Sequence, residues 1–90
     1  MQIIFDDAKR ERTLLERGLD FADAHQLFAG QHLTAEDVRQ AYGECRYISI
    51  GFLSHRMVVL VWTPRGAARR IISMRKANER EHILYRDRLG

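Results

Sequence analysis

Residues 46–63 read RYISIGFLSHRMVVLVWT and contain the strongest strand signals of the chain. Its two runs of β-branched and aromatic residues, 46–53 and 57–63, are separated by the polar residues 54–56. Runs of this length and composition favour β-strands, and a short polar break between them is typical of an antiparallel hairpin. A proline and a glycine within residues 64–66 predict the next turn. The stretch therefore predicts the centre of an antiparallel sheet.

Helix signals lie on both sides of this sheet. Asp6 is a good N-cap for a helix that ends at Gly18, and Asp20 caps a second helix with Asp23 in capping-box spacing. In chain order, we expect a strand at 2–5, a helix at 7–17, a helix from 20 to 30, strands at 33–38, 46–53, 57–63 and 68–76, and a helix from about 77 to 89.

The expected order is β-α-α-β-β-β-β-α, with two N-terminal helices, an antiparallel sheet and a C-terminal helix. Sequential antiparallel strands with helices at the ends of the chain indicate the α+β class. Helices must cover one face of such a sheet, whereas its other face can remain open. We expect residues 1–90 to form one domain, because a chain of 90 residues suits a single small core.

Composition narrows the class of protein. The chain is 46% apolar and 30% charged, as in soluble globular proteins, and its longest apolar run, 57–62, has the length of a strand. Residues 1–6 lack the features of a signal peptide, so we expect the protein to be cytoplasmic. The single cysteine, Cys45, leaves no partner for an internal disulfide.

Charge divides the chain into two unequal halves. Residues 1–45 carry 5 Lys+Arg and 9 Asp+Glu, whereas residues 46–90 carry 10 and 3. A basic half of this kind is typical of a surface that binds polyanions, although small proteins are often basic without such a function. The four histidines have no paired metal-ligand spacing, and no glycine-rich phosphate loop is present in the sequence. We therefore expect no metal and no cofactor.

The densest basic segment is the expected strand 68–76. Strict alternation places Arg69, Ile71, Ser73 and Arg75 on one face, and Arg70, Ile72, Met74 and Lys76 on the other. Arginine matches phosphate oxygens through its planar fork and remains charged at every relevant pH. Trp62 could add a surface for stacking bases, but its place at the end of an apolar strand favours a core position. Arg80, Arg86 and Arg88 suit a solvated helix face.

The sequence resembles the BrnT family of bacterial toxins over nearly its whole length. The matching residues are Phe5, Asp6, Lys9, Gly18, Phe21 and Ala24, then residues 42–47 with Ile50 and Gly51, and finally Trp62, Thr63, Arg65, Gly66, residues 70–73, residues 75–77, Glu81 and Tyr85. It departs from the family pattern at Thr13, where Asn is common, and at Arg17, where His is common.

The resemblance implies a RelE-like fold and a metal-independent endoribonuclease that cleaves RNA and inhibits translation. It also implies neutralisation by a BrnA-type antitoxin with a ribbon-helix-helix DNA-binding domain, in a complex of two toxins and two antitoxins. In that scheme, operator DNA is bound only through the antitoxin.

Metal-free RNA cleavage assigns roles to the basic segment. Arg65 and Arg75 are the candidates for binding the phosphate, Glu44 is a candidate base, and Tyr85 or Lys76 could protonate the leaving oxygen. Arg46, Arg69, Arg70 and Trp62 are the candidates for other RNA contacts. For Glu44, a structural ion pair with Arg46 is an equal alternative. A non-catalytic RNA-binding or protein-docking module with a basic sheet face is the rival function.

Overall fold

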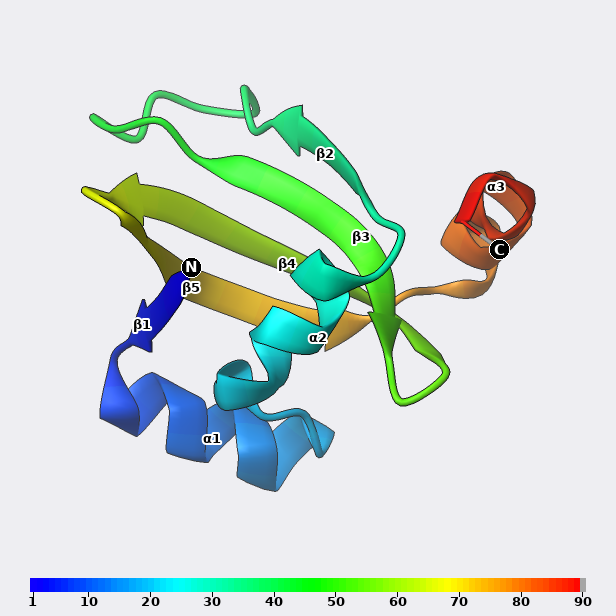
Figure 1. Ribbon diagram of the computed structural model, residues 1–90, viewed down its shortest axis with the longest axis horizontal. Coiled ribbons are helices and arrows are strands. Elements are labelled where there is room, and N and C mark those ends of the chain that lie inside the picture. The colour runs from blue at the N-terminus through cyan, green and yellow to red at the C-terminus, as the bar shows by residue number, and fades with distance from the viewer. Residues whose placement is uncertain (90) are drawn as a thin grey trace.

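The centre of the computed structural model, which describes residues 1–89, is a five-stranded sheet. The strands lie in the order β1-β5-β4-β3-β2 (Figure 1). The elements are β1 (Gln2–Phe5), α1 (Asp7–Arg17), the 3₁₀ helix η1 (Phe21–Asp23), α2 (Ala24–Ala29), β2 (Leu33–Glu36), β3 (Tyr47–Leu53), β4 (Arg56–Arg65), β5 (Ala68–Lys76) and α3 (Glu79–Leu89). The α+β class is confirmed.

The sheet is mixed and not purely antiparallel as the sequence predicted. β2, β3, β4 and β5 pair antiparallel, but β1 pairs parallel to the first half of β5, from Gln2 beside Ala68 to Phe5 beside Ile71. Most of the chain separates β1 from β5, so no tight turn constrains the direction of pairing. A short apolar strand pattern carries no information about that direction.

The first three helices cover one face of the sheet. α1 has no buried residue and lies outermost, whereas η1 and α2 bury Phe21, Ala24 and Leu27 against the strands. Leu60 and Met74 on the strands are also completely buried in this cluster. Phe21, Ala24 and Leu27 follow each other at intervals of three residues, which places them on one helical face.

α3 lies at one end of the opposite face, at the right of Figure 1. Its Leu89 and Tyr85 pack with Ile50, Met57 and Val59 in a second, smaller apolar cluster. The helix begins at Glu79 and not at Ala77, because Asn78 takes the position before its first turn. α3 leaves part of this sheet face uncovered, and we call that uncovered side the open face.

A β-bulge in β5 overturns the strict alternation predicted for this strand. Val61 pairs with Ser73 but its neighbour Trp62 pairs with Ile71, so β5 has one extra residue at position 72. One extra residue reverses the facing of every side chain after it. Ile71 therefore packs beneath the helices, as does Met74 three residues later, while Ser73 and Arg75 face the open side.

The turns also differ from expectation at two places. Pro64 lies within β4, beyond the pair of Trp62 with Tyr47, the first residue of β3, so that β4 has only β5 as a partner at this position, and an edge position of this kind tolerates proline. The turn consists of residues 66 and 67, with Gly66 at a φ of 56° that favours glycine. The second predicted helix is a 3₁₀ turn followed by α2. The Asp20 side chain accepts from Ala22 N at 2.9 Å, and Asp23 N donates to the Asp20 backbone carbonyl at 3.0 Å instead of to its side chain.

Candidate active site

A cleft of about 530 Å³ lies on the open face between the sheet and α3. Aliphatic side chains of β2, β3 and β4 form its floor, namely Leu33, Ala35, Ile48, Ile50, Val59 and Val61. Its rim is polar, with three arginines and one glutamate, and consists of Thr34, Arg39, Ser73, Arg75, Glu81, Tyr85 and Arg88. An apolar floor with a few converging charged groups is typical of a binding site.

Arg75 is held by the start of α3. Its two terminal nitrogens donate to the two carboxylate oxygens of Glu81 at 2.8 and 2.9 Å. Glu81 also accepts from the backbone N–H of Asn78 at 2.9 Å, and the Asn78 side chain accepts from the Glu81 backbone N–H at 2.8 Å. This reciprocal capping box fixes the helix start and the carboxylate together.

The same contacts set the ionisation of the pair. The hydrogen bonds from Arg75, and then from the Asn78 backbone, lower the pKa of Glu81 to about 2 in spite of its partial burial. The hydrogen bond to Glu81 likewise raises the pKa of Arg75, an effect that the like charge of Arg39 opposes. Both groups are therefore charged at neutral pH, and Arg39 lies within electrostatic reach of Arg75.

Arg39 reaches the rim from the loop between β2 and β3. Its Nε and Nη2 donate to Asp37 at 2.8 and 2.7 Å, and the Tyr42 hydroxyl donates to the same carboxylate at 3.0 Å. The Asp37 side chain is completely buried, whereas 66% of the Arg39 side chain is exposed. Buried Asp37 thus holds Arg39 in place while the Arg39 side chain stays accessible to solvent.

Glu44, Arg46 and Arg65 form a second charged group that does not line the cleft. Glu44 accepts from Arg46 Nε at 3.0 Å and from Arg65 Nη2 at 2.9 Å. The hydrogen bond from Arg46, followed by that from Arg65, lowers the pKa of Glu44. Arg65 ends β4 and does not lie in the turn as predicted. Arg46 also packs over the Tyr42 ring at 4.2 Å, beside the support of Arg39.

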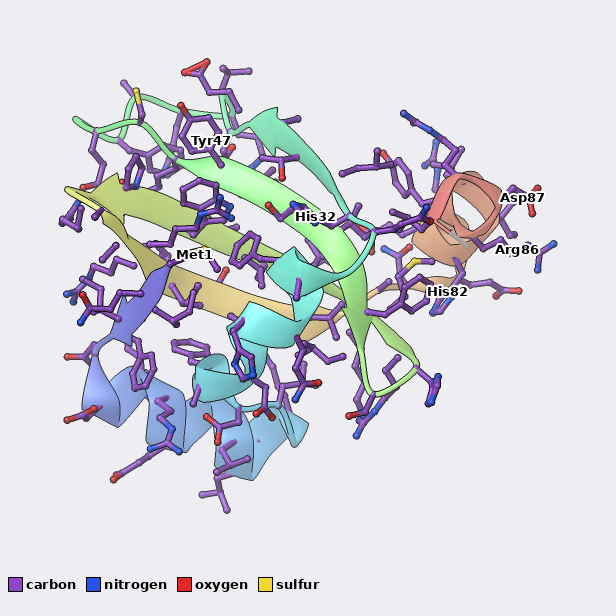
Figure 2. The ribbon with its side chains drawn as sticks, in the orientation of Figure 1. Met1, His32, Tyr47, His82, Arg86 and Asp87 are labelled. Atoms are coloured by element: carbon purple, nitrogen blue, oxygen red, sulfur yellow. The ribbon has the colours of Figure 1, made fainter. Side chains whose placement is uncertain are left out.

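Trp62 and Arg69 lie on the helix-covered side of the sheet. Trp62 stacks on Tyr47, which is labelled in Figure 2, with the two ring centres 4.9 Å apart. The Arg69 guanidinium lies 4.5 Å from the ring centre of Trp62 and 4.2 Å from the ring centre of Phe28. The Trp62 ring N–H donates to buried Ser49 at 2.9 Å. Both residues are engaged in packing, which agrees with the core position expected for Trp62.

The remaining sequence candidates divide between the cleft and its surroundings. Tyr85 lines the cleft, whereas Lys76 and Arg70 do not. Arg88 lines it as well, lies 5.8 Å from the Tyr85 ring centre and remains exposed, as expected for a solvated helix face. Arg86 does project from α3 away from the sheet (Figure 2).

Arg39, Ser73 and Glu81 are rim residues that sequence reasoning left without a role. For Glu81 a signal was present, because Asn78 followed three residues later by Glu is a capping-box pattern. The spacing of Asp37 and Arg39 is a weaker signal. The bulge that puts Ser73 and Arg75 on the opposite face from Arg69 and Ile71 has no sequence signature.

Among residues 1–89, no helix has the length and apolar character needed to span a membrane, and no three His, Cys, Asp or Glu side chains are grouped as metal ligands. The fold and the cleft together define a small α+β protein whose arginine-lined open face suits a polyanion.

Its family is BrnT, the ribonuclease toxin of type II toxin–antitoxin systems, whose family model matches residues 5–81, and the chain belongs to this family. No curated protein matches the chain significantly. Membership in the family identifies a ribonuclease toxin, with an antitoxin as its partner.

Proposed function

We propose that this toxin is a metal-independent endoribonuclease and that RNA is cleaved in the cleft between the open face and α3. The observation that carries the proposal is the meeting of Arg75, Glu81 and Tyr85 on one rim of this cleft. These side chains come from β5 and α3, in the basic half of a chain that belongs to a ribonuclease family. Together they supply a cation, a proton acceptor and a hydroxyl donor.

The reaction needs three functions. The 2′-hydroxyl oxygen attacks the adjacent phosphorus, and its proton passes to a base. The bond between phosphorus and the 5′-oxygen breaks, and that oxygen receives a proton. The products are a 2′,3′-cyclic phosphate and a 5′-hydroxyl. Between these steps the phosphate carries additional negative charge, which a fixed guanidinium stabilises.

Arg75 is the residue we assign to that charge, and Glu81 to the proton of the 2′-hydroxyl. In the free protein the hydrogen bond from Arg75 is the largest cause of the low pKa of Glu81. When a phosphate replaces Glu81 as the acceptor of the Arg75 hydrogen bonds, the pKa of Glu81 rises and Glu81 becomes a stronger base. Tyr85 is the donor to the leaving oxygen, because Lys76 does not line the cleft.

The Glu44, Arg46 and Arg65 group has a supporting role in this proposal. Glu44 was the candidate base, but two arginines hold it outside the cleft and lower its pKa. Arg65 and Arg46 retain donors for phosphates of an RNA strand that extends beyond the cleft. Arg70 is a further candidate for such contacts, whereas the packing of Trp62 and Arg69 leaves them out.

The wider biology of the proposal follows from the family and its resemblance. The protein has a RelE-like fold, acts in the cytoplasm and inhibits translation by cutting RNA. A BrnA-type antitoxin with a ribbon-helix-helix domain neutralises it in a complex of two copies of each. Operator DNA is contacted only through that antitoxin.

Arg75→Ala tests the assignment most directly. Loss of one fixed donor to a charged transition state costs about 10²–10³-fold in rate, so we expect cleavage of a reporter RNA to fall by that factor. Arg86→Ala is the matched control, because it removes an arginine that projects from α3 away from the sheet (Figure 2). Arg65→Ala should have a smaller effect. Equal activity of the Arg75→Ala and Arg86→Ala proteins would remove Arg75 from the mechanism.

Two further observations separate the proposal from its rivals. Cleavage by the purified protein should persist in excess chelator, and strict dependence on magnesium would sink the metal-independent reaction. RNA fragments should carry 2′,3′-cyclic ends. Salt-sensitive RNA binding without such ends, at any protein concentration, would instead indicate a non-catalytic binding module.

A further inference from the structure

Of the three arginines that line the cleft, Arg39 and Arg75 are each held by a carboxylate through two hydrogen bonds. Glu81 holds Arg75, and Asp37 holds Arg39. The bonds use different atoms. Both terminal nitrogens of Arg75 are engaged with Glu81, whereas Arg39 uses Nε and Nη2 and keeps Nη1 free of hydrogen bonds within residues 1–89. Arg39 can therefore contact an anion without releasing its carboxylate.

The support of Arg39 is also more rigid than that of a typical surface arginine. Asp37 is completely buried and accepts four hydrogen bonds, from the Arg39 backbone, from two nitrogens of its side chain and from Tyr42. The Asp37 N–H donates to the Arg46 carbonyl at 2.7 Å, which fixes the loop to the start of β3. A guanidinium held in this way loses little conformational freedom when it binds.

The surroundings of the two arginines favour an anion between them. They line one cleft, and the charge of Arg39 disfavours the charge of Arg75. Like charges that share a partly enclosed site repel each other, and an anion placed between them removes that repulsion. Glu81 and Asp37 each offset one of these charges in the free protein, but Nη1 of Arg39 keeps its hydrogens free of hydrogen bonds within residues 1–89.

We propose that Arg39 is a second phosphate-binding residue of the cleft, and that Asp37 and Tyr42 are the residues that position it. The proposal rests on the RNA-cleaving function proposed above and names how the substrate is bound there. Arg39 binds the phosphate in the ground state and in the transition state alike, because its support does not change. Arg75 has to exchange Glu81 for phosphate before Glu81 can act as the base, so its contact gains most as negative charge develops on the phosphate in the transition state.

This division predicts different kinetic effects for the two residues. Arg39→Ala should raise KM about tenfold, as expected for loss of one charge-assisted hydrogen bond, and leave kcat nearly unchanged. Arg75→Ala should mainly lower kcat. A decrease in kcat for Arg39→Ala as large as that for Arg75→Ala would overturn the ground-state role.

Binding without cleavage gives the sharper test. A short 2′-O-methyl RNA cannot undergo 2′-hydroxyl attack, and its affinity can be followed by fluorescence anisotropy at several salt concentrations. One lost phosphate contact to a single strand reduces the slope of log K against log salt by about 0.7. Arg39→Ala should show this reduction, and Arg39→Lys should keep the slope but bind more weakly. Arg12→Ala, which removes an exposed arginine from α1 on the other side of the sheet, is the control for charge alone.

The positioning role of Asp37 requires a different readout, because Asp37→Asn also reduces stability. In the folded variant, as verified by its melting curve, RNA affinity should fall even though Arg39 is present. In the Arg39→Ala background, the same change should cause no further fall, since residues that act through one another are not additive. Tyr42→Phe should show the same pattern with a smaller effect. An additive loss in the double variant would contradict positioning.

The outcomes distinguish this proposal from the one on which it rests. If the wild-type protein neither binds nor cleaves RNA, the proposed function itself fails. If wild type and Arg12→Ala bind and cleave, and Arg39→Ala has the same salt slope and KM, only the role of Arg39 is refuted. Equal reductions in slope for Arg12→Ala and Arg39→Ala would also refute it, because they indicate an effect of net charge.

Discussion

The two faces of the sheet differ in what covers them. Leu60 of β4 is completely buried under η1 and α2, whereas the next residue, Val61, lines the cleft on the open face. The helix-covered face buries a mainly apolar cluster, beside which Ser49 and Arg69 contact Trp62, whereas the open face surrounds an aliphatic floor with three arginines and Glu81. Because successive residues of a strand point to opposite faces, the same strands can bury a core on one face and line an accessible cleft on the other.

The largest expected effect is a difference in stability between variants of two neighbouring β4 residues that face opposite sides of the sheet. Leu60→Ala should lower the free energy of unfolding by about 2–5 kcal/mol, because it removes buried methyl groups and leaves a cavity that the packed helices do not fill. Val61→Ala should cost only about 1 kcal/mol, since its half-buried side chain already borders the cleft. Urea denaturation of both variants measures the difference. Similar losses would show that the open face contributes as much to stability as the helix-covered one.

The second prediction concerns the close approach of α2 to the sheet. A Cβ on Gly51 would lie 2.8 Å from Cγ of Leu27 and 3.1 Å from Cβ of His32, both on the helix-covered side. Gly51→Ala should therefore reduce stability by about 1–3 kcal/mol through overpacking. The Leu27→Ala, Gly51→Ala double variant should recover part of the loss attributable to that contact. A melting curve that is unchanged for Gly51→Ala would show that α2 adjusts freely.

The smallest expected effect is the contribution of the ion pair between Glu81 and Arg75 to stability, which depends on pH. The pKa of Glu81 is about 2 in the folded protein, against an ordinary value of 4.5. A depressed pKa stabilises the folded state above the unfolded value, and this contribution is lost as pH falls from about 4.5 towards 2. Because 44% of the Arg75 side chain is exposed, solvent screening limits the contribution to the order of 1 kcal/mol.

Glu81→Gln provides the measurement for this ion pair. Its stability in urea at neutral pH should be lower than that of wild type, and the two proteins should approach each other in acid. Glu79→Gln, which removes an exposed carboxylate from the same helix, should keep the wild-type pH dependence. Parallel curves for Glu81→Gln and wild type between pH 4.5 and 2 would contradict a stabilising pair.

Much of the fold could be predicted because its signals are local. The strand runs 46–53 and 57–63, the caps Asp6 and Gly18, and the buried positions of α2 each follow from residues close in sequence. The parallel direction of β1 could not, because it depends on pairing between the two ends of the chain. The residues of the cleft were predictable in part, since the candidates Arg75 and Tyr85 line it, but Arg39 and Glu81, which also line it, were left without a role.

The sequence by itself determined the strands, the helices and the concentration of positive charge in the second half of the chain. The tertiary structure alone decided which of those charges meet. An extra residue at position 72 places Arg69 beneath the helices and Arg75 on the open face, although alternation puts them on the same side. Side chains of a strand alternate between the two faces of the sheet, so the extra residue that β5 has in its pairing with β4 moves every later side chain to the other face. The residues around position 72 do not by themselves specify that pairing.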